Sequence, residues 1–218
     1  MNKQVVALVP VKGNSERVKK KNLRPFADTT LFDLKIQQLV KVGMFSDIIV
    51  SSECADVLNR ARQYGVNVHE RDPYYSTSEV PMSEVYTHIA SNFNFEHIAW
   101  VNVTNPLADC DVYAEALTIY SDLGPQYDCL LSVRKLQEYI YHEQKPLNFK
   151  PNPWQRSQDL AGTHSLTFVI NVLRRSDMVM WGSCVGKRPY LYELDSLTST
   201  DIDQQHNFDF CELVYRNK

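Results

Sequence analysis

Short apolar runs and helix-spaced apolar positions alternate along the first two thirds of the chain. The continuous runs predict strands that are buried on both faces, at 5–11, 47–50, 66–69, 97–101 and 128–133. Between them, apolar residues three and four positions apart predict amphipathic helices, at 31–42, 53–64, 82–93 and 112–120. The alternation predicts an α/β fold of three layers, α/β/α, with a Rossmann-like and mostly parallel sheet.

This pattern breaks between about residues 134 and 164, and three prolines interrupt the stretch: Pro146, Pro151 and Pro153. It does not predict another strand–helix unit, so we expect an excursion from the sheet, either a lid or a dimerisation arm. Strands are expected again at 165–172 and 190–194, and a closing helix at 207–215. We therefore predict a single domain over residues 1–218 with an inserted arm.

The composition excludes several classes of protein. The chain has 218 residues, 44% hydrophobic and 22% charged, which excludes collagen-like, disordered and coiled-coil proteins. A net charge of −3 argues against a nucleic-acid partner. The apolar runs are far shorter than the ~18 residues of a membrane span, and the chain opens without a signal-peptide pattern. Its five cysteines and six histidines lack metal-site or disulfide spacing, so we expect a cytoplasmic protein without a transition metal.

Ligands of open parallel sheets bind beyond the carboxyl ends of the strands, so function is expected just after Val11, Val50, Val101 and Val172. The first of these loops, residues 10–22, reads PVKGNSERVKKKN and carries five basic residues against one acid. Its small turn residues can direct backbone N–H groups at a phosphate while the lysines neutralise the charge. The P-loop and GxGxxG patterns are both absent, and a solvated basic loop is the alternative interpretation.

A second candidate lies near the other end, where residues 195–203 read DSLTSTDID. Asp201 and Asp203 are two positions apart, and alternate residues of an extended segment point the same way. Two carboxylates suit Mg²⁺, which takes one or two of them together with phosphate oxygens of a substrate. A solvent-facing acidic turn is the alternative, but the basic loop elsewhere in the chain favours the metal site.

Together these segments resemble the cytidylyltransferases that make CMP-sialic acid (acylneuraminate) and CMP-Kdo. The basic loop is similar to their signature PARxGSKxIPxKN, with which it has in common Pro10, Gly13 in the turn, Ser15, Lys21 and Asn22. It departs from that signature at Lys12, Glu16 and Lys19, where the family has arginine, lysine and proline.

The resemblance extends over nearly the whole chain. Residues 50–53 (VSSE) resemble the family's VSTD, and Arg71 stands where the family has an arginine associated with the nucleotide. Residues 101–107 (VNVTNPL) resemble LLQPTSPLR, so Asn102 takes the place of a glutamine that reads cytosine, and Ala108 that of an arginine. Residues 195–203 are similar to DSxDIDT.

The resemblance implies an enzyme that transfers CMP from CTP to the anomeric hydroxyl of an acidic nonulosonic- or Kdo-type sugar. Pyrophosphate is released, and the CMP-sugar serves the synthesis of surface polysaccharide. The implied partners are CTP, the sugar, Mg²⁺ and a second copy of the chain. Two alternatives stay open: a nucleotidyltransferase with another acceptor or nucleotide, and a catalytically impaired nucleotide-binding relative, which Glu16 favours.

The residues that carry these implied roles fall into four groups. The expected catalytic residues are Lys12, Lys21 and Asp203. The expected nucleotide-binding residues are Gly13, Asn14, Ser15, Asn22, Arg71 and Asn102. The expected sugar-binding residues are Thr104, Gln155, Arg156 and Ser165, the middle two reaching across a dimer. The expected ligands of Mg²⁺ are Asp201 and Asp203.

Overall fold

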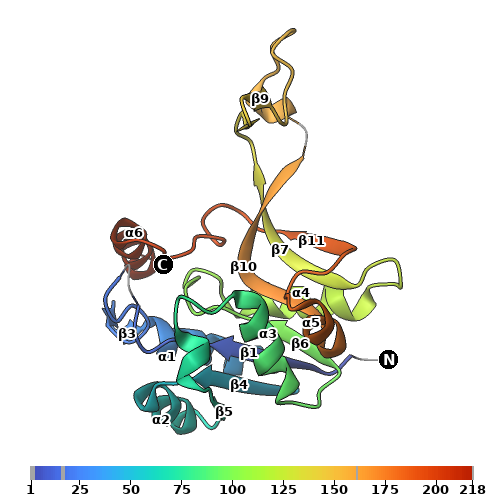
Figure 1. Ribbon diagram of the computed structural model, residues 1–218. Helices are drawn as coiled ribbons and strands as arrows, with labels where there is room; N and C mark the ends of the chain where they lie inside the picture. The colour runs from blue at the N-terminus through green and yellow to red at the C-terminus, as the bar shows by residue number, and fades with distance from the viewer. Residues whose placement is uncertain (1–2, 16–17, 161, 218) are drawn as a thin grey trace.

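The computed structural model describes residues 3–15, 18–160 and 162–217. At its centre is a seven-stranded sheet in the order β11-β7-β10-β6-β1-β4-β5 (Figure 1). Its strands are β1 (Val5–Pro10), β4 (Asp47–Ser52), β5 (Asn67–Glu70), β6 (His97–Trp100), β7 (Cys129–Leu136), β10 (Thr163–Arg174) and β11 (Pro189–Glu193). Two small hairpins pair β2 (Pro25–Phe26) with β3 (Thr29–Thr30), and β8 (Tyr141–His142) with β9 (Lys145–Pro146).

Six α-helices are present in the described part of the chain. They are α1 (Leu31–Val42), α2 (Ala55–Gln63), α3 (Met82–Ser91), α4 (Cys110–Asp122), α5 (Arg175–Trp181) and α6 (Gln205–Arg216). Two 3₁₀ turns, η1 (Pro73–Ser76) and η2 (Ser157–Asp159), complete the elements. None of these helices is both long and apolar enough to cross a membrane.

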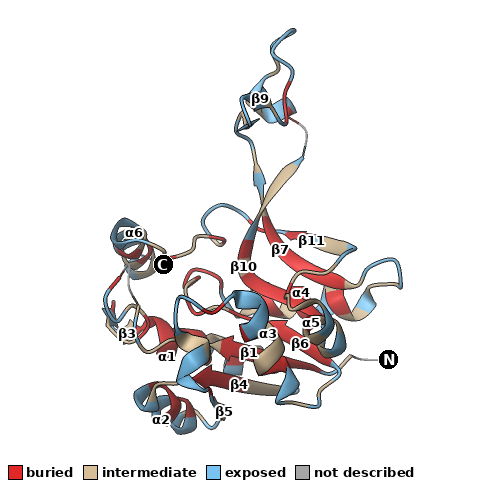
Figure 2. Ribbon diagram, in the orientation of Figure 1, coloured by how far each residue is buried: buried red, intermediate tan, exposed pale blue. Residues whose placement is uncertain are grey.

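Strand β1 shows how the three layers form. Val5, Ala7 and Val9 pack in one buried cluster with residues of α1, α2 and α4. Val6 and Leu8, which point the other way, pack in a second cluster with residues of α3 and α5. The sheet is accordingly buried between two helical layers (Figure 2). The predicted three-layer α/β/α fold with a mostly parallel sheet is confirmed.

Strand β10 runs antiparallel to both of its neighbours, β6 and β7. Arg174, at its end, pairs with His97 at the start of β6. The carboxyl end of β10 therefore lies at the opposite edge of the sheet from the carboxyl ends of β1, β4 and β6. The expectation that the residues after Val172 belong to the functional edge was wrong, because an apolar run does not encode the direction of a buried strand.

Residues 137–160 form an arm that projects from the sheet on a two-stranded ribbon (Figure 1). Pairing of β7 with β10 continues to Leu136 and Thr163, past an irregularity between Leu166 and Asn171. Aromatic side chains that are scattered in the sequence gather in the arm around Phe149, which is 8% exposed. Ring centroids lie 4.8 to 5.7 Å apart among Tyr139, Tyr141, Phe149 and Trp154.

The closing helix α6 brings the C-terminal segment back beside the first loop. Its Phe208 and Cys211 share a buried cluster with Phe26, Leu31 and Leu107. The ring of Phe208 lies edge-on to that of Phe26, with centroids 5.4 Å apart. Burial of this apolar face fixes where residues 195–204 run, which is across the carboxyl edge of the sheet.

Candidate active site

A pocket of about 390 Å³ opens at the carboxyl edge of β1 and β6. Three segments line it: the loop after β1, the turn after η1 and the loop after β6. The lining residues are Pro10, Lys12, Asn14, Ser15, Val18, Lys21, Asn22, Ser76, Ser78, Asn102, Val103 and Thr104. Most of the residues expected to bind nucleotide or act in catalysis are thus brought together in one cavity, with two lysines in its wall.

The loop after β1 is held in shape by its own side chains. Asn22, which is 7% exposed, donates from Nδ2 to the carbonyl of Lys12 over 2.9 Å and so joins the two ends of the loop. Lys12 Nζ donates to the carbonyl of Thr77, 3.3 Å away, across the mouth of the pocket. The position of Glu16 lies outside the described residues. A loop fixed in this way presents its lysines to a phosphate at a lower entropic cost.

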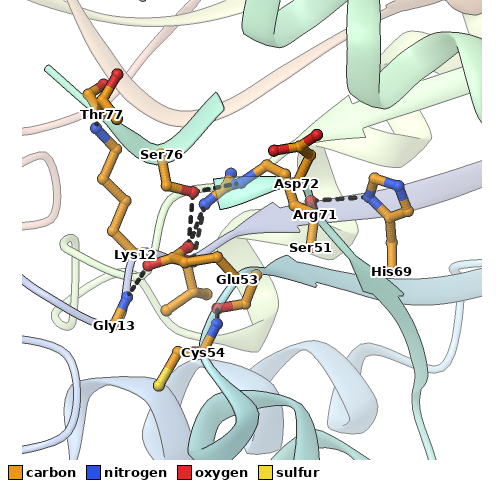
Figure 3. Close-up of polar contacts among 12 residues, drawn as sticks. Lys12, Gly13, Ser51, Glu53, Cys54, His69, Arg71, Asp72, Ser76 and Thr77 are labelled. Atoms are coloured by element: carbon orange, nitrogen blue, oxygen red, sulfur yellow. Dashed lines mark hydrogen bonds and ion pairs between the residues drawn. The ribbon is translucent and has the colours of Figure 1, made fainter. Parts of the chain in front are cut away.

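Glu53, just after β4, is the centre of a polar network behind the pocket (Figure 3). Its Oε1 accepts the backbone N–H of Gly13 over 2.8 Å. Its Oε2 accepts from the hydroxyl of Ser76 over 2.8 Å and from the guanidinium of Arg71 over 3.0 Å. Burial raises the pKa of Glu53, but hydrogen bonds from Gly13, its own N–H, Ser76 and Arg71 outweigh burial, so the net pKa is lowered. Glu53 is therefore a carboxylate that ties three loops together.

Arg71 lies behind the pocket wall and is not among the residues that line the cavity. It is 2% exposed, and it donates to the carbonyl of Val11 over 3.1 Å and to Ser76 Oγ over 3.0 Å. In this conformation Arg71 supports the start of the loop after β1 rather than pointing into the cavity. The sequence resemblance expected Arg71 to contact the nucleotide, whereas its side chain bonds to the protein behind the pocket wall.

Gly13 packs so closely on α2 that no larger residue fits. A Cβ at this position would lie 2.5 Å from Cys54 Cβ and 2.7 Å from Cys54 Sγ. We expect Gly13→Ala to push the loop away from Glu53 and to destabilise the fold by about 1–3 kcal/mol, the usual cost of overpacking. The measurement is thermal unfolding, followed by nucleotide binding.

Two variants control this prediction. Gly162→Ala is the matched glycine change, because a Cβ there meets only His164 Cε1, at 3.5 Å; its expected effect is within about 0.5 kcal/mol. Cys54→Gly removes both clashing atoms, so the Gly13→Ala/Cys54→Gly double variant should recover the loss. An unchanged Gly13→Ala protein would show that the loop is not packed as described.

The 201–203 segment meets the pocket through its backbone. Lys21 Nζ donates to the carbonyl of Ile202, and the Ile202 N–H donates to the carbonyl of Thr104 over 2.9 Å. The carboxylates of Asp201 and Asp203 do not line the cavity. Asp201 lies close to α6: burial and the nearby Asp201 charge together raise the pKa of the Cys211 thiol to about 12. The backbone of this segment therefore borders the pocket, and the assignment of Asp201 and Asp203 to Mg²⁺ stays a prediction.

A cation at this place would have few protein ligands. No group of three or more His, Cys, Asp or Glu side chains is arranged for a metal within the described ranges. Mg²⁺ binds one or two carboxylates and keeps water and substrate oxygens in its remaining positions. Asp201 and Asp203 thus have the ligand chemistry that Mg²⁺ prefers, although neither carboxylate lines the pocket in this conformation.

The residues expected to bind the sugar are split among three places: the pocket, the base of the arm and the arm itself. Thr104 lines the pocket, and Ser165 pairs with Arg134 in the ribbon at the base of the arm. Gln155 and Arg156 lie in the arm, outside the cavity. Arg156 is paired there with Asp159, its Nε lying 2.7 Å from Oδ2. Within one copy of the chain, the structure does not bring the arm residues to the pocket.

Sequence reasoning assigned no role to Glu53 or to Lys35, a buried lysine on α1. The only sequence feature that could have indicated Glu53 is its position at the end of the VSSE segment, at the carboxyl end of β4. Lys35 could have been found from the helical pattern. It places a charge among core positions of α1, where the pattern requires an apolar residue.

A family model described as cytidylyltransferase matches residues 6–208. The chain belongs to the cytidylyltransferase family. This agrees with the resemblance drawn from the residues.

Individual relatives are distant. The chain is 21% identical over 230 residues to the N-acylneuraminate cytidylyltransferase of Escherichia coli O18:K1:H7, covering 100% of this chain and 54% of that protein. It is 24% identical over 117 residues to the pseudaminic acid cytidylyltransferase of Campylobacter jejuni, covering 51% of this chain and 50% of the relative. The chain thus spans about half the length of these curated relatives.

The same fold occurs among solved structures. The CMP:2-keto-3-deoxy-manno-octonic acid synthetase complexed with CTP superposes with a TM-score of 0.74 at 11% identity, covering 98% of this chain and 99% of that one. At this identity the likeness shows the fold alone. It places the seven-stranded sheet and its helices among the cytidylyltransferase architectures.

Proposed function

We propose that the chain transfers CMP from CTP to the anomeric hydroxyl of an acidic sugar of the sialic acid, pseudaminic acid or Kdo class. The observation that carries the proposal is the pocket at the carboxyl edge, where two lysines meet amide and hydroxyl side chains in a cytidylyltransferase-family chain. Relatives named for N-acylneuraminate and pseudaminic acid support an acidic acceptor.

The reaction needs positioning and charge neutralisation rather than covalent catalysis. The sugar oxygen forms a bond with the α-phosphorus, the α–β phosphoanhydride bond breaks, and pyrophosphate leaves with its electron pair. We assign Lys12, Ser15 and Lys21 to the phosphate oxygens, because these side chains line the pocket. We assign Asp203 to accept the proton of the sugar hydroxyl, either directly or through water.

The nucleoside is assigned to the other wall of the pocket. Asn102 offers an amide donor and acceptor that match the edge of cytosine. Asn14 and Asn22 lie in the loop opposite. Gly13 and Arg71 act from behind, since both bond to Glu53 and hold the loop in place.

Asp201 and Asp203 are assigned to Mg²⁺. The bound cation supplies charge neutralisation at the phosphates and orientation of the attacking oxygen. Lys21 contributes to the same site by fixing the carbonyl of Ile202, the residue between the two carboxylates.

The arm is assigned to a second copy of the chain. Large apolar side chains are exposed on it, Trp154 at 64%, Tyr141 at 60% and Leu147 at 58%. Solvent-exposed aromatic groups of this kind mark protein–protein contact surfaces. In a homodimer, Gln155 and Arg156 would reach the partner's pocket and complete the sugar site together with Thr104 and Ser165.

The first test is thermal unfolding with CTP, UTP, GTP, ATP and CMP, each with Mg²⁺. A nucleotide at 100 times its Kd adds about 2.7 kcal/mol, which for a chain of this length raises the unfolding midpoint by roughly 5–10 °C. We expect the largest shift with CTP and a smaller one when Mg²⁺ is omitted. Preference for another nucleotide would overturn the proposal.

The second test measures pyrophosphate release with N-acetylneuraminate, pseudaminate and Kdo, with neutral glucose as the control acceptor. Release with one acidic sugar identifies the acceptor class. A CTP-specific rise in the unfolding midpoint without pyrophosphate release in the presence of any acidic sugar would instead support the alternative, a nucleotide-binding relative impaired in catalysis. Glu16 is the sequence feature that favours this alternative.

A further inference from the structure

Lys35 of α1 is completely buried, at 0% exposed. Its Nζ donates to the carbonyl of Asn105 over 2.9 Å, to that of Ala108 over 3.5 Å and to the hydroxyl of Tyr113. The three donors of an ammonium group thus meet three acceptors. Burial lowers the pKa of Lys35 to about 7, against the opposing effect of the Asp109 charge. An apolar side chain would avoid this cost of burial but would leave the carbonyls of Asn105 and Ala108 without this donor.

Those contacts converge on the loop after β6, where Asn105 is also 0% exposed. Asn105 Nδ2 lies 3.4 Å from the carbonyl of Thr167 in β10 and 3.3 Å from the carbonyl of Thr200. One side chain therefore connects the pocket loop, strand β10 and the residue directly before Asp201. The neighbouring bond from the Ile202 N–H to Thr104 joins the same two segments.

We propose that Asn105, with its backbone fixed by Lys35, is a positioning residue that sets Asp201 and Asp203 against the nucleotide pocket. The proposal rests on the proposed function for the roles of the two carboxylates. Asn105 touches no pocket surface itself. It acts by fixing where the 200–203 segment begins. Asn105 itself follows two residues of the pocket wall, Asn102 by three positions and Thr104 by one.

The test replaces Asn105 by leucine, which has a similar shape and no donors. We expect kcat to fall at least about tenfold. The KM for CTP should stay within about twofold, because the nucleotide wall is retained. The Mg²⁺ concentration for half-maximal rate should rise. Asn105→Ser is a milder change that keeps a shorter hydrogen-bond donor, and we expect an intermediate kcat for it. It takes the place of the leucine variant in the test if that variant does not fold.

Asn171→Leu is the matched control. Asn171 is equally buried, at 0% exposed, but its Nδ2 contacts Cys184 Sγ over 3.4 Å, and neither residue lines the pocket. It should lower the unfolding temperature by an amount comparable to Asn105→Leu and leave kcat within about twofold. Equal losses of kcat in the two variants would overturn the proposal, because general destabilisation would then explain both.

Amide hydrogen exchange gives a readout that does not depend on activity. The Ile202 N–H, bonded to Thr104, should exchange at least about tenfold faster in Asn105→Leu and at the wild-type rate in Asn171→Leu. Unchanged exchange at Ile202 would overturn the proposal even if activity is lost. If the wild-type protein transfers CMP to no acceptor, the proposed function fails, and exchange at Ile202 still decides whether Asn105 positions the segment.

Discussion

Replacing Lys21 by alanine is expected to slow CMP transfer by more than about tenfold, equivalent to over 1.4 kcal/mol of transition-state stabilisation. Lys21 lines the pocket, and its Nζ donates to the carbonyl of Ile202. The substitution therefore removes a positive charge from the proposed phosphate site. It also removes the hydrogen bond that connects this loop to the segment of the expected Mg²⁺ ligands. Preorganised charge in a closed site contributes more than the same charge in water.

The measurement is kcat/KM from pyrophosphate release, with the acidic sugar that the acceptor panel identifies. Lys19→Ala is the matched control, because Lys19 is an exposed lysine of the same loop and lies outside the pocket lining. It should stay within about twofold of wild type. Lys21→Met retains the apolar stem and should behave like alanine. If Lys21→Ala also stays within twofold of wild type, Lys21 has no direct role at the phosphates.

Most of the fold was predictable from the sequence because each helix buries one face and each central strand buries both. The helix predicted over 31–42 is α1, Leu31–Val42, and the remaining predicted helices and strands are present within a few residues. Helix α5 was not predicted, because its seven residues follow β10 directly, with no turn signal between them. The direction of β10 was missed for a different reason: both faces of a central strand are apolar whichever way it runs.

The candidate site was predictable as a set of segments but not as a set of contacts. Glycine and lysine spacing located the loop after β1, and strand order then placed Asn102 and Thr104 across from it. No pattern along the chain indicated that Arg71 turns inward to Glu53. Side-chain direction at a loop depends on partners that are distant in sequence, and here these are 18 residues apart.

Replacing Arg71 by methionine is expected to lower the free energy of unfolding by about 3 kcal/mol at pH 7, because removal of one partner leaves a buried charge uncompensated. Arg71 is 2% exposed and holds the carbonyl of Val11, Ser76 Oγ and the Glu53 carboxylate. Methionine fills the volume but donates no hydrogen bond. For a chain of this length the loss corresponds to a fall of roughly 6–12 °C in the unfolding midpoint. The measurement is urea and thermal unfolding.

The pH dependence of this loss separates the ion pair from simple packing. The pKa of folded Glu53 lies below its ordinary value of 4.5, so the stability from its ionised form is present above pH 4.5 and is lost as the pH falls through the folded pKa. The difference between wild type and Arg71→Met should therefore shrink below pH 4.5. Arg216→Met is the control: Arg216 pairs with Glu212 at 2.8 Å, and the two side chains are 55% and 27% exposed, so its loss should cost under about 1 kcal/mol. Equal losses for the two variants would mean that the network around Glu53 does not hold the loop after β1.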